Sequence, residues 1–387
     1  MTTVLVSAGD ASGDAYAADL VRALRARRPG TRFLGLGGPE LAGAGVELAV
    51  DQRELAAGGL FELLPDLPRI ARAWLRLVRA LEAARPELAV LVDSAGFNLP
   101  LARRARRAGA STLYYVCPQV WAWRRARVRK LARRIDRLAV ILPFERDFYA
   151  AAGLAVDFVG HPLLDRLVAR GALPDRRAAR AALGLPAGGR LVALLPGSRR
   201  GELRQGLALF LATARALHAR DPGIGFVLPL ASSIEPAFAE ARLRAAALPG
   251  GLRLALAPGR SLEALCACDV ALVKPGTATL EAALLGRPLV VAARVARPSA
   301  ALLRRLVAVD CLALPNLLAG RRVVPEFLQE QARPERIAAA LEERFEGRVR
   351  EEQLAALAQL RPALGEGGAA GRTAEIAHEM LCARRAA

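Results

Sequence analysis

Two stretches of the sequence combine residue types that could bind a phosphorylated substrate. Leu194–Arg200 (LLPGSRR) has the pattern of a buried strand that ends in a Gly-Ser-Arg turn and enters a helix. Such a turn offers backbone N–H groups, the Ser198 hydroxyl and the Arg199 guanidinium to an anion, usually a phosphate. Tyr115–Arg125 (YVCPQVWAWRR) places two tryptophans and a Pro-Gln pair after another strand-like run, before a basic helix. With aromatics in one half and a phosphate turn in the other, we expect a two-lobed enzyme with its site in the cleft.

A third stretch carries the residue types of a nucleotide site. Residues 276–291 (GTATLEAALLGRPLVV) place Gly276, Thr277 and Thr279 at the expected start of a helix. N–H groups and hydroxyls at a helix start can bind the phosphates of a donor. Glu281 lies in the first turn, where a carboxylate often holds a ribose through its hydroxyls. The alternative is a helix cap without a ligand.

The opening turn SAGDASGD suits a sugar better than a pyrophosphate. Gly9 and Gly13 let the backbone approach a ligand closely, and Ser12 could cap the following helix. Asp10 and Asp14 would repel a pyrophosphate, whereas carboxylates accept hydrogen bonds from sugar hydroxyls. The alternative is a capped turn whose acids face solvent.

A second carboxylate follows an apolar strand in LVDSAGFN. Asp93 comes directly after Leu88–Val92, and a carboxylate at the carboxyl end of a strand is a candidate general base. The alternative is an Asp that caps the next helix. Phe97 and Asn98 would shape the same loop.

The elements that must position these residues alternate between strand and helix. Each strand pattern is short and apolar and stops at Gly, Pro, Asp or Ser, and helical spans fill the gaps. The patterns lie at Val4–Val6, Phe33–Leu36, Leu88–Val92, Thr112–Val116 and Arg137–Ile141, then Leu191–Leu195, Phe226–Leu230, Leu252–Leu256, Val270–Val273 and Pro288–Val291. This alternation predicts parallel doubly wound sheets, in which function gathers at the carboxyl ends of the strands.

The pattern pauses near Val159, and a polar, Arg-rich segment over residues 173–190 leads to the second half. We therefore predict an α/β chain of two Rossmann-like doubly wound domains, residues 1–172 and 173–387. The first would face the acceptor and the second would bind the nucleotide sugar. The C-terminal tail could pack back on the first domain or on a partner subunit. With the phosphate and ribose residues above, this organisation suggests a nucleotide-sugar transferase of the GT-B architecture.

Composition limits the other function classes. Net charge is +19, from 56 Lys plus Arg against 37 Asp plus Glu, so the surface attracts phosphates, although a coding bias toward Arg would produce the same excess. Aromatics make up 5% of the residues and the tryptophans lie only at positions 74, 121 and 123, which argues against a nucleic-acid groove. Five scattered cysteines and three histidines disfavour a structural metal and fit reduced cytoplasmic thiols. We expect neither a membrane-spanning helix nor a signal peptide.

A helix over residues 63–81 has two interpretations. Ile70, Trp74, Leu77 and Leu81 form one stripe, and arginines occupy the opposite face, at Arg69, Arg72, Arg76 and Arg79. One interpretation is a helix packed on the core with a solvated cationic face. The other is a helix that touches an anionic membrane, beside a hydrophobic lip of Leu60, Phe61, Leu63 and Leu64.

The chain resembles the lipid-A-disaccharide synthase family nearly from end to end. The matching motifs, in order, are SAGDASGD, FLGLGGPELAGAGVE, VDSAGFN, YYVCPQVWAWRRARV, ILPFERDFY, FVGHPLLD, LLPGSRRGEL, GTATLEAALLGRPLVV and LPNLLAGRRVVPEFLQ. The resemblance implies a bacterial glycosyltransferase that joins UDP-2,3-diacylglucosamine to 2,3-diacylglucosamine 1-phosphate with inversion. The products would be the β(1→6) lipid A disaccharide 1-phosphate and UDP. It also implies a cytoplasmic enzyme bound peripherally to the anionic inner-membrane surface, without a cofactor and with homodimer formation as a further expectation.

The resemblance also implies roles for residues. Asp93 matches the family's essential aspartate and would act as base or contact the acceptor hydroxyl. Arg199 matches its essential arginine and, with Gly276–Thr277, would neutralise charge on UDP. Because no Asp-x-Asp pair suits a metal, arginine and helix ends would do this work. The implied substrate-binding residues are Asp10, Ser12, Gly13, Asn98, Gln119, Trp121, Ser198, Gly276, Thr277, Glu281, Asn316, Glu326 and Gln329.

The sequence departs from the family pattern at a few positions, mostly in the expected UDP region. The departures are Asp10, Gly58, Pro275, Ala293, Ala308 and Cys311. They leave Asp93, Arg199 and Glu281 in place, so we expect an active enzyme. The rival functions are a transferase acting on a peptidoglycan precursor, a basic protein that binds nucleic acid or anionic lipid, and an inactive relative that only binds membrane.

Overall fold

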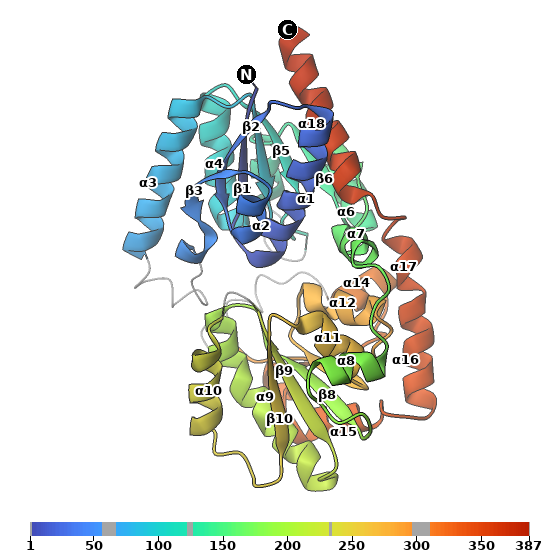
Figure 1. Cartoon of the computed structure of the whole chain (residues 1–387). Coiled ribbons are helices and arrows are strands. Elements are labelled where there is room, and N and C mark those ends of the chain that lie inside the picture. The colour runs from blue at the N-terminus through green and yellow to red at the C-terminus, as the bar shows by residue number, and fades with distance from the viewer. Residues whose placement is uncertain (1, 56–66, 122–126, 232–233, 296–309, 387) are drawn as a thin grey trace. The chain divides into compact units, whose positions relative to one another are not determined.

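The computed structural model describes residues 2–55, 67–121, 127–231, 234–295 and 310–386 (Figure 1). The chain divides into two compact units. Unit 1 holds the described residues up to Ala169 together with those from Leu364 onward, and unit 2 holds those from Arg170 to Ala363. The predicted domains, 1–172 and 173–387, differ from this division chiefly in the tail. Residues 60, 61, 63 and 64 of the predicted lip, Gly58, Trp123 and Ala308 lie outside the described residues.

Unit 1 is built on a seven-stranded parallel sheet with the order β3-β2-β1-β4-β5-β6-β7. Its strands are β1 (Thr3–Ala8), β2 (Arg32–Gly37), β3 (Glu47–Asp51), β4 (Leu88–Val92), β5 (Ser111–Tyr115), β6 (Arg137–Val140) and β7 (Val156–Phe158). Its helices are α1 (Ala11–Arg27), α2 (Pro39–Gly43), α3 (Leu67–Ala84), α4 (Ala95–Arg107), α5 (Val128–Ala132), α6 (Pro143–Ala150), α7 (Pro162–Ala169) and α18 (Ala369–Ala386), with the 3-10 turn η1 (Gln52–Glu54). Among the described residues, no helix is both long and apolar enough to cross a membrane.

Unit 2 is built on a six-stranded parallel sheet with the order β10-β9-β8-β11-β12-β13. Its strands are β8 (Leu191–Leu195), β9 (Gly225–Leu230), β10 (Arg253–Pro258), β11 (Val270–Val273), β12 (Leu289–Ala293) and β13 (Glu326–Leu328). Its helices are α8 (Arg176–Ala182), α9 (Arg200–Arg220), α10 (Pro236–Ala245), α11 (Ser261–Ala267), α12 (Thr277–Leu284), α14 (Leu314–Ala319), α15 (Pro334–Glu342), α16 (Arg348–Ala358) and α17 (Leu360–Ala363), with η3 (Gln329–Gln331).

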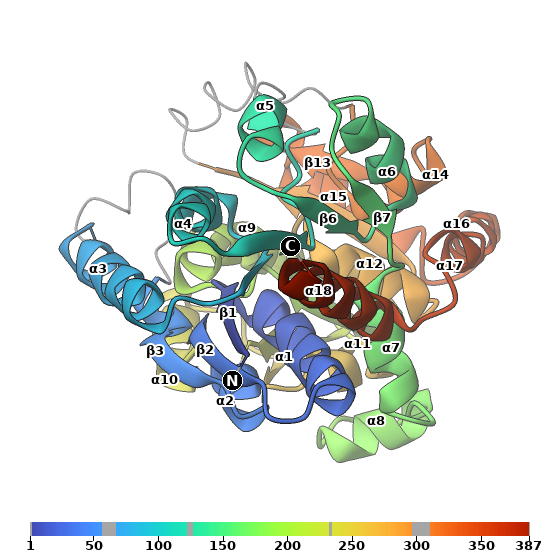
Figure 2. The same cartoon turned by 90° about the horizontal axis from the view of Figure 1, so that it is seen from above.

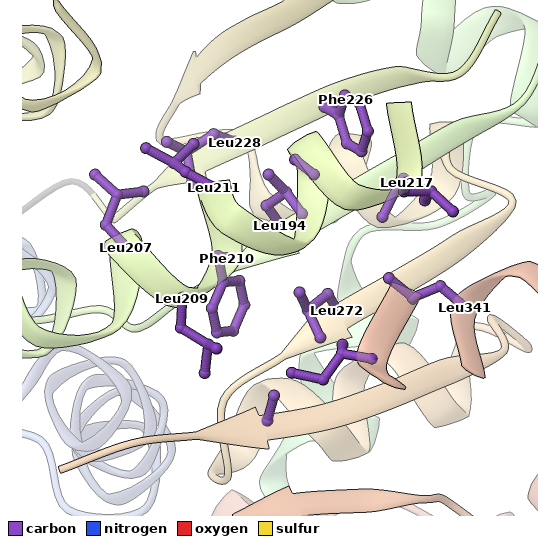
Figure 3. Close-up of a cluster of buried hydrophobic side chains, with 14 of the residues drawn as sticks. Leu194, Leu207, Leu209, Phe210, Leu211, Leu217, Phe226, Leu228, Leu272 and Leu341 are labelled. Atoms are coloured by element: carbon purple, nitrogen blue, oxygen red, sulfur yellow. The ribbon is translucent and has the colours of Figure 1, made fainter. Parts of the chain in front are cut away.

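A core of aliphatic and phenylalanine side chains fixes α9 and α15 on the sheet of unit 2. Phe210 of α9 lies among Leu194 of β8, Leu272 of β11 and Leu341 of α15, and all four are at most 1% exposed (Figure 3). Burying a side chain of this size stabilises the fold by about 1.5–3 kcal/mol. The start of α9 is therefore held firmly where it follows the turn after β8.

Strand order reverses at the same place in both sheets. In unit 1, β1 lies between β2 and β4, and in unit 2, β8 lies between β9 and β11. Ligands of doubly wound sheets bind beyond the carboxyl ends of the strands at such a switch point. The loops after β1 and β4 carry Asp10 and Asp93, and those after β8 and β11 carry Arg199 and Gly276.

The C-terminal helix α18 packs along α1 of unit 1 (Figure 2). Small buried residues, Ala374 and Ala377, face the unit, and Leu381 is fully buried. Arg372 donates to the carbonyl of Val159 from both Nε (3.0 Å) and Nη2 (2.7 Å). The tail is thus a structural part of unit 1.

Candidate active site

The turn after β1 is ordered by Asp10. Its carboxylate is the N-cap of α1, because Oδ1 accepts the Gly13 N–H at 2.7 Å and the Ser12 hydroxyl at 3.0 Å. The prediction that Ser12 caps the helix is therefore wrong: Ser12 donates to the residue that does. Asp14 is 1% exposed and accepts the N–H groups of Gly38, Glu40 and Leu41, so it does not face solvent as one alternative required.

Asp93 stands in a strained turn at the end of β4. Asp93 and Ser94 have φ angles of +46° and +45°, and Val116, at the end of β5, has a φ of +55°. Each such residue costs roughly 1–3 kcal/mol, and residues of this kind cluster at functional sites. The strained residues support one another, because the Asp93 N–H donates to the carbonyls of Tyr115 (3.3 Å) and Val116 (3.2 Å).

The side chain of Asn98 holds the Asp93 turn through hydrogen bonds. Its Nδ2 donates to the carbonyls of Asp93 and Val92 at 2.9 Å, and its Oδ1 accepts the Ser7 hydroxyl at 2.7 Å. Tyr114 Oη also donates to the Asp93 carbonyl. Asn98 is 0% exposed, and these bonds confirm that it shapes the loop of Asp93; its contact with substrate stays a prediction.

The turns after β1 and β4 lie directly against each other. A Cβ added to Gly9 would come within 2.5 Å of Ser94 Oγ. Only glycine permits this approach, which brings the Asp10 and Asp93 loops together in unit 1.

Trp121 is buried against Glu145 and Phe144. Its indole Nε1 donates to Glu145 Oε1 at 2.9 Å, and its ring makes an edge contact with Phe144. At 5% exposure it holds the segment after β5 in place, and its contact with substrate stays a prediction. Gln119, in the same segment, is exposed.

Glu145 is the buried partner of this segment. It is 1% exposed and also accepts the N–H groups of Ile141 (3.3 Å) and Leu142 (3.1 Å). Burial raises its pKa to about 7, although the three N–H donors favour the ionised form.

In unit 2, Glu202 holds the Gly-Ser-Arg turn in place. Gly197 has a φ of +141°, and a Cβ there would lie 2.5 Å from the Cβ of Glu202. Glu202 Oε2 accepts the Ser198 N–H at 3.0 Å, so this N–H is not offered to an anion as the sequence suggested. Ser198 and Arg199 are exposed at the start of α9.

The same carboxylate ties the turn to the neighbouring strand. Glu202 Oε1 accepts Lys274 Nζ at 3.0 Å, and the Lys274 N–H donates to the Leu195 carbonyl at 3.0 Å. Burial acts to raise the pKa of Glu202, but Lys274 and Arg199 outweigh it and hold the pKa below its ordinary value. The Ser198–Arg199 and Gly276–Thr277 turns are thereby brought together.

Gly276 is the N-cap of α12, in a conformation that favours glycine. Its φ is +149°, it is exposed, and its carbonyl accepts the Thr279 hydroxyl at 2.7 Å. Thr279 is 0% exposed, so its hydroxyl is used within the turn. Thr277 and Glu281 lie in the first turns and are half-buried.

Asn316 and Glu326 form a network of their own. Asn316 Nδ2 donates to Glu326 Oε1 at 2.8 Å, and Glu326 accepts the N–H groups of Leu312 and Ala313 before α14. Asn316 is 1% exposed and positions Glu326, and its contact with UDP stays a prediction. Gln329 has a φ of +53°, and its Oε1 accepts the Val295 N–H at 3.4 Å.

Three positioning residues were not predicted from the sequence: Glu145, Glu202 and Lys274. Both glutamates lie inside motifs that were recognised, ILPFERDFY and LLPGSRRGEL. Lys274 had a signal of its own, because a chain with 56 Lys plus Arg keeps lysine only there and at Lys130.

Known proteins of one family match this chain over nearly its whole length. Residues 4–379 match the family described as lipid-A-disaccharide synthetase. A lipid-A-disaccharide synthase of Myxococcus xanthus (strain DK1622) is 45% identical over 380 residues, covering 98% of this chain and 97% of the relative. One of Pseudomonas aeruginosa (strain UCBPP-PA14) is 46% identical over 338 residues, covering 87% and 88%.

Solved structures share the fold at low identity. The UDP-GlcNAc 2-epimerase of Neisseria meningitidis aligns with a TM-score of 0.68 at 13% identity, covering 98% of this chain and 100% of that one. MurG of Acinetobacter baumannii aligns with a TM-score of 0.56 at 15% identity, with the same coverage. The predicted fold class, two Rossmann-like doubly wound domains of the GT-B type, is confirmed. Given the end-to-end match, the chain belongs to the lipid-A-disaccharide synthase family and is a UDP-sugar-dependent glycosyltransferase of lipid A synthesis.

Proposed function

We propose that the chain joins UDP-2,3-diacylglucosamine to 2,3-diacylglucosamine 1-phosphate, with inversion. The products are the β(1→6) lipid A disaccharide 1-phosphate and UDP. The family match over residues 4–379 is the observation that carries this proposal. The polar residues at both switch points support it, because an acyl-sugar acceptor and a nucleotide donor need different groups.

On the acceptor side, the proposal gives Asp93 the role of base. An acceptor hydroxyl that attacks the anomeric carbon must lose its proton, and a positioned carboxylate can take it. The strained turn and its bonds to Asn98 and Tyr114 support this role, since they fix the backbone that carries the carboxylate. Asp10, Ser12, Gly13 and Gln119 remain proposed acceptor contacts.

On the donor side, Arg199 neutralises the charge that develops on the leaving UDP. Ser198, Gly276 and Thr277 contact the phosphates and Glu281 holds the ribose. Glu326 and Gln329 stay proposed contacts nearby. This is electrostatic catalysis by fixed groups, which needs no reorganisation as the bond breaks.

The test is a reconstituted reaction. The purified chain is incubated with both substrates in detergent without added metal, and UDP release and product mass are followed. Asp93→Asn and Arg199→Gln are compared with Asp147→Asn, an exposed carboxylate on α6. We expect disaccharide from wild type and Asp147→Asn only. Transfer to a peptidoglycan precursor, or no product with several acyl lengths, would contradict the proposed substrates.

We also propose peripheral contact with the anionic cytoplasmic face of the inner membrane through α3. The apolar stripe of this helix packs inward: Leu77 and Leu81 are 0% exposed, and Trp74 makes an edge contact with Phe97. The outer face keeps the arginines and exposes Leu67 and Leu75, at 49% and 52%. Contact would therefore be chiefly electrostatic. Homodimer formation stays a prediction that sedimentation of the purified chain tests.

A further inference from the structure

The ion pair between Glu202 and Lys274 lies at the Gly-Ser-Arg turn, where the proposed function places the diphosphate of the donor. Glu202 is a carboxylate beneath the Gly-Ser-Arg turn, and its Oε2 takes the Ser198 N–H. A negative charge at this place opposes the binding of a diphosphate. Lys274 Nζ, 3.0 Å from Oε1, is the cation that offsets it.

Both side chains keep part of their surface open. Glu202 is 25% exposed and Lys274 is 29% exposed, so their charges are only partly screened by water. The Glu202 carboxylate nevertheless fixes the turn, because it accepts the Ser198 N–H. The preceding residue, Gly197, lies so close to Glu202 that no side chain fits there. The fold thus requires an anion under the turn and a cation to cancel it.

We propose that Lys274 is a positioning residue for the donor, one that neutralises Glu202 and ties the Gly-Ser-Arg turn to the start of α12. The inference rests on the proposed function in taking a nucleoside diphosphate as the ligand. Lys274 acts through Glu202, and it is Arg199 that meets the phosphates. This role has a specific consequence for charge. Loss of Lys274 should weaken donor binding because the Glu202 carboxylate is then no longer neutralised.

A double-mutant cycle in the full chain tests this statement. Lys274→Met keeps the side-chain length without the charge, and Glu202→Gln keeps an oxygen that can accept the Ser198 N–H. The single and double variants are compared for UDP affinity by titration calorimetry and for the donor KM and kcat. Lys274→Arg is the conservative variant. Arg220→Gln, which breaks a 2.8 Å pair with Glu342 at the far end of the same helix, is the matched control.

We expect Lys274→Met to weaken UDP binding and raise the donor KM by about ten- to a hundredfold, with a smaller effect on kcat, because an uncompensated neighbouring charge shifts an equilibrium by roughly 1–2 log units. Adding Glu202→Gln should restore most of the loss, and Lys274→Arg should retain binding. The defect should shrink at high salt.

Two results would overturn the inference. If Lys274→Met weakens UDP binding as much in the Glu202→Gln background as in wild type, Lys274 contacts the phosphates directly. If the loss of UDP affinity does not depend on salt and is equally large in Arg220→Gln, the Glu202–Lys274 pair has only a structural role. Failure of wild type to bind UDP would instead contradict the proposed function. Circular dichroism establishes that each variant is folded.

Discussion

Asp93 combines the carboxylate that we propose as the base with a left-handed backbone conformation. Asparagine adopts this conformation as readily as aspartate, whereas alanine pays for it in strain. Asp93→Asn therefore removes the charge and leaves the turn. We expect kcat to fall by about 10²–10⁴-fold, as for loss of a general base, with the melting temperature unchanged. Activity within tenfold of wild type would remove Asp93 from the chemistry.

The buried Glu145 predicts a pH dependence of stability. Its pKa in the folded protein is about 7, above the ordinary 4.5, so the folded state binds more protons between these values. Its contribution to the free energy of unfolding is therefore largest below pH 4.5 and declines by about 3 kcal/mol as the pH rises past 7. Burial also raises the pKa values of Cys117 and Tyr149 beside it, so these two do not titrate in this range.

Urea unfolding of wild type and Glu145→Gln at pH 4.5, 6 and 8 measures this. The stability of wild type relative to Glu145→Gln should decline with pH. A rise would show that the N–H donors of Trp121, Ile141 and Leu142 outweigh burial.

For single residues, the sequence predicts the loop in which a residue lies better than it predicts the contacts of its side chain. Asp93 could be found because it follows an apolar strand, and Arg199 because it follows a glycine turn. The loops that carry Trp121, Asn98 and Asn316 could be found, but the buried hydrogen bonds of these side chains could not. Their burial depends on partners distant in sequence, such as Ser7 for Asn98, and no local pattern reveals it.

At the scale of elements, α3 joins a buried stripe to a cationic face, and the face can be tested alone. Arg72 and Arg79 are exposed. Replacing both with Gln should weaken binding to vesicles that contain anionic lipid by roughly 30-fold, since each arginine near such a surface contributes about 1 kcal/mol. Binding to neutral vesicles should not change.

Vesicle sedimentation checks this, with Arg177→Gln/Arg361→Gln in unit 2 as the control of equal charge. If both pairs weaken binding equally, the net charge of +19 rather than α3 draws the protein to the membrane.

The sequence patterns predicted the central strands of each sheet but not all of its edge strands. Among the described residues, the strands missed by the sequence are β3, β7 and β13, and all three lie at sheet edges. Strands β7 (VDF) and β13 (EFL) have only three residues and are half-buried throughout, and in β3 (ELAVD) only Val50 is buried. An edge strand is covered on fewer sides, so it does not need the continuous apolar run that marks a central strand.

At the scale of the whole molecule, the tail completes unit 1. Removing the chain from Ala369 onward exposes the surface that Ile376 and Leu381 cover, at 6% and 0% exposure. Burial of these two side chains alone is worth about 3–6 kcal/mol, so unit 1 should unfold at much lower denaturant.

Tryptophan fluorescence reads this out, because all three tryptophans precede residue 170. Truncation after Arg384 is the control and should leave the midpoint unchanged. An unaltered midpoint after the longer truncation would show that α18 is dispensable.

The return of the tail to unit 1 has a consequence for biosynthesis. The ribosome reaches Leu364 only after it has made all of unit 2, which at roughly 5–20 residues per second takes on the order of 10–40 s. During that interval the α1 face that α18 will cover is open, and Arg372 has yet to reach the Val159 carbonyl. The nascent chain can finish unit 2 first, so the unit whose translation begins first is the last to complete its fold.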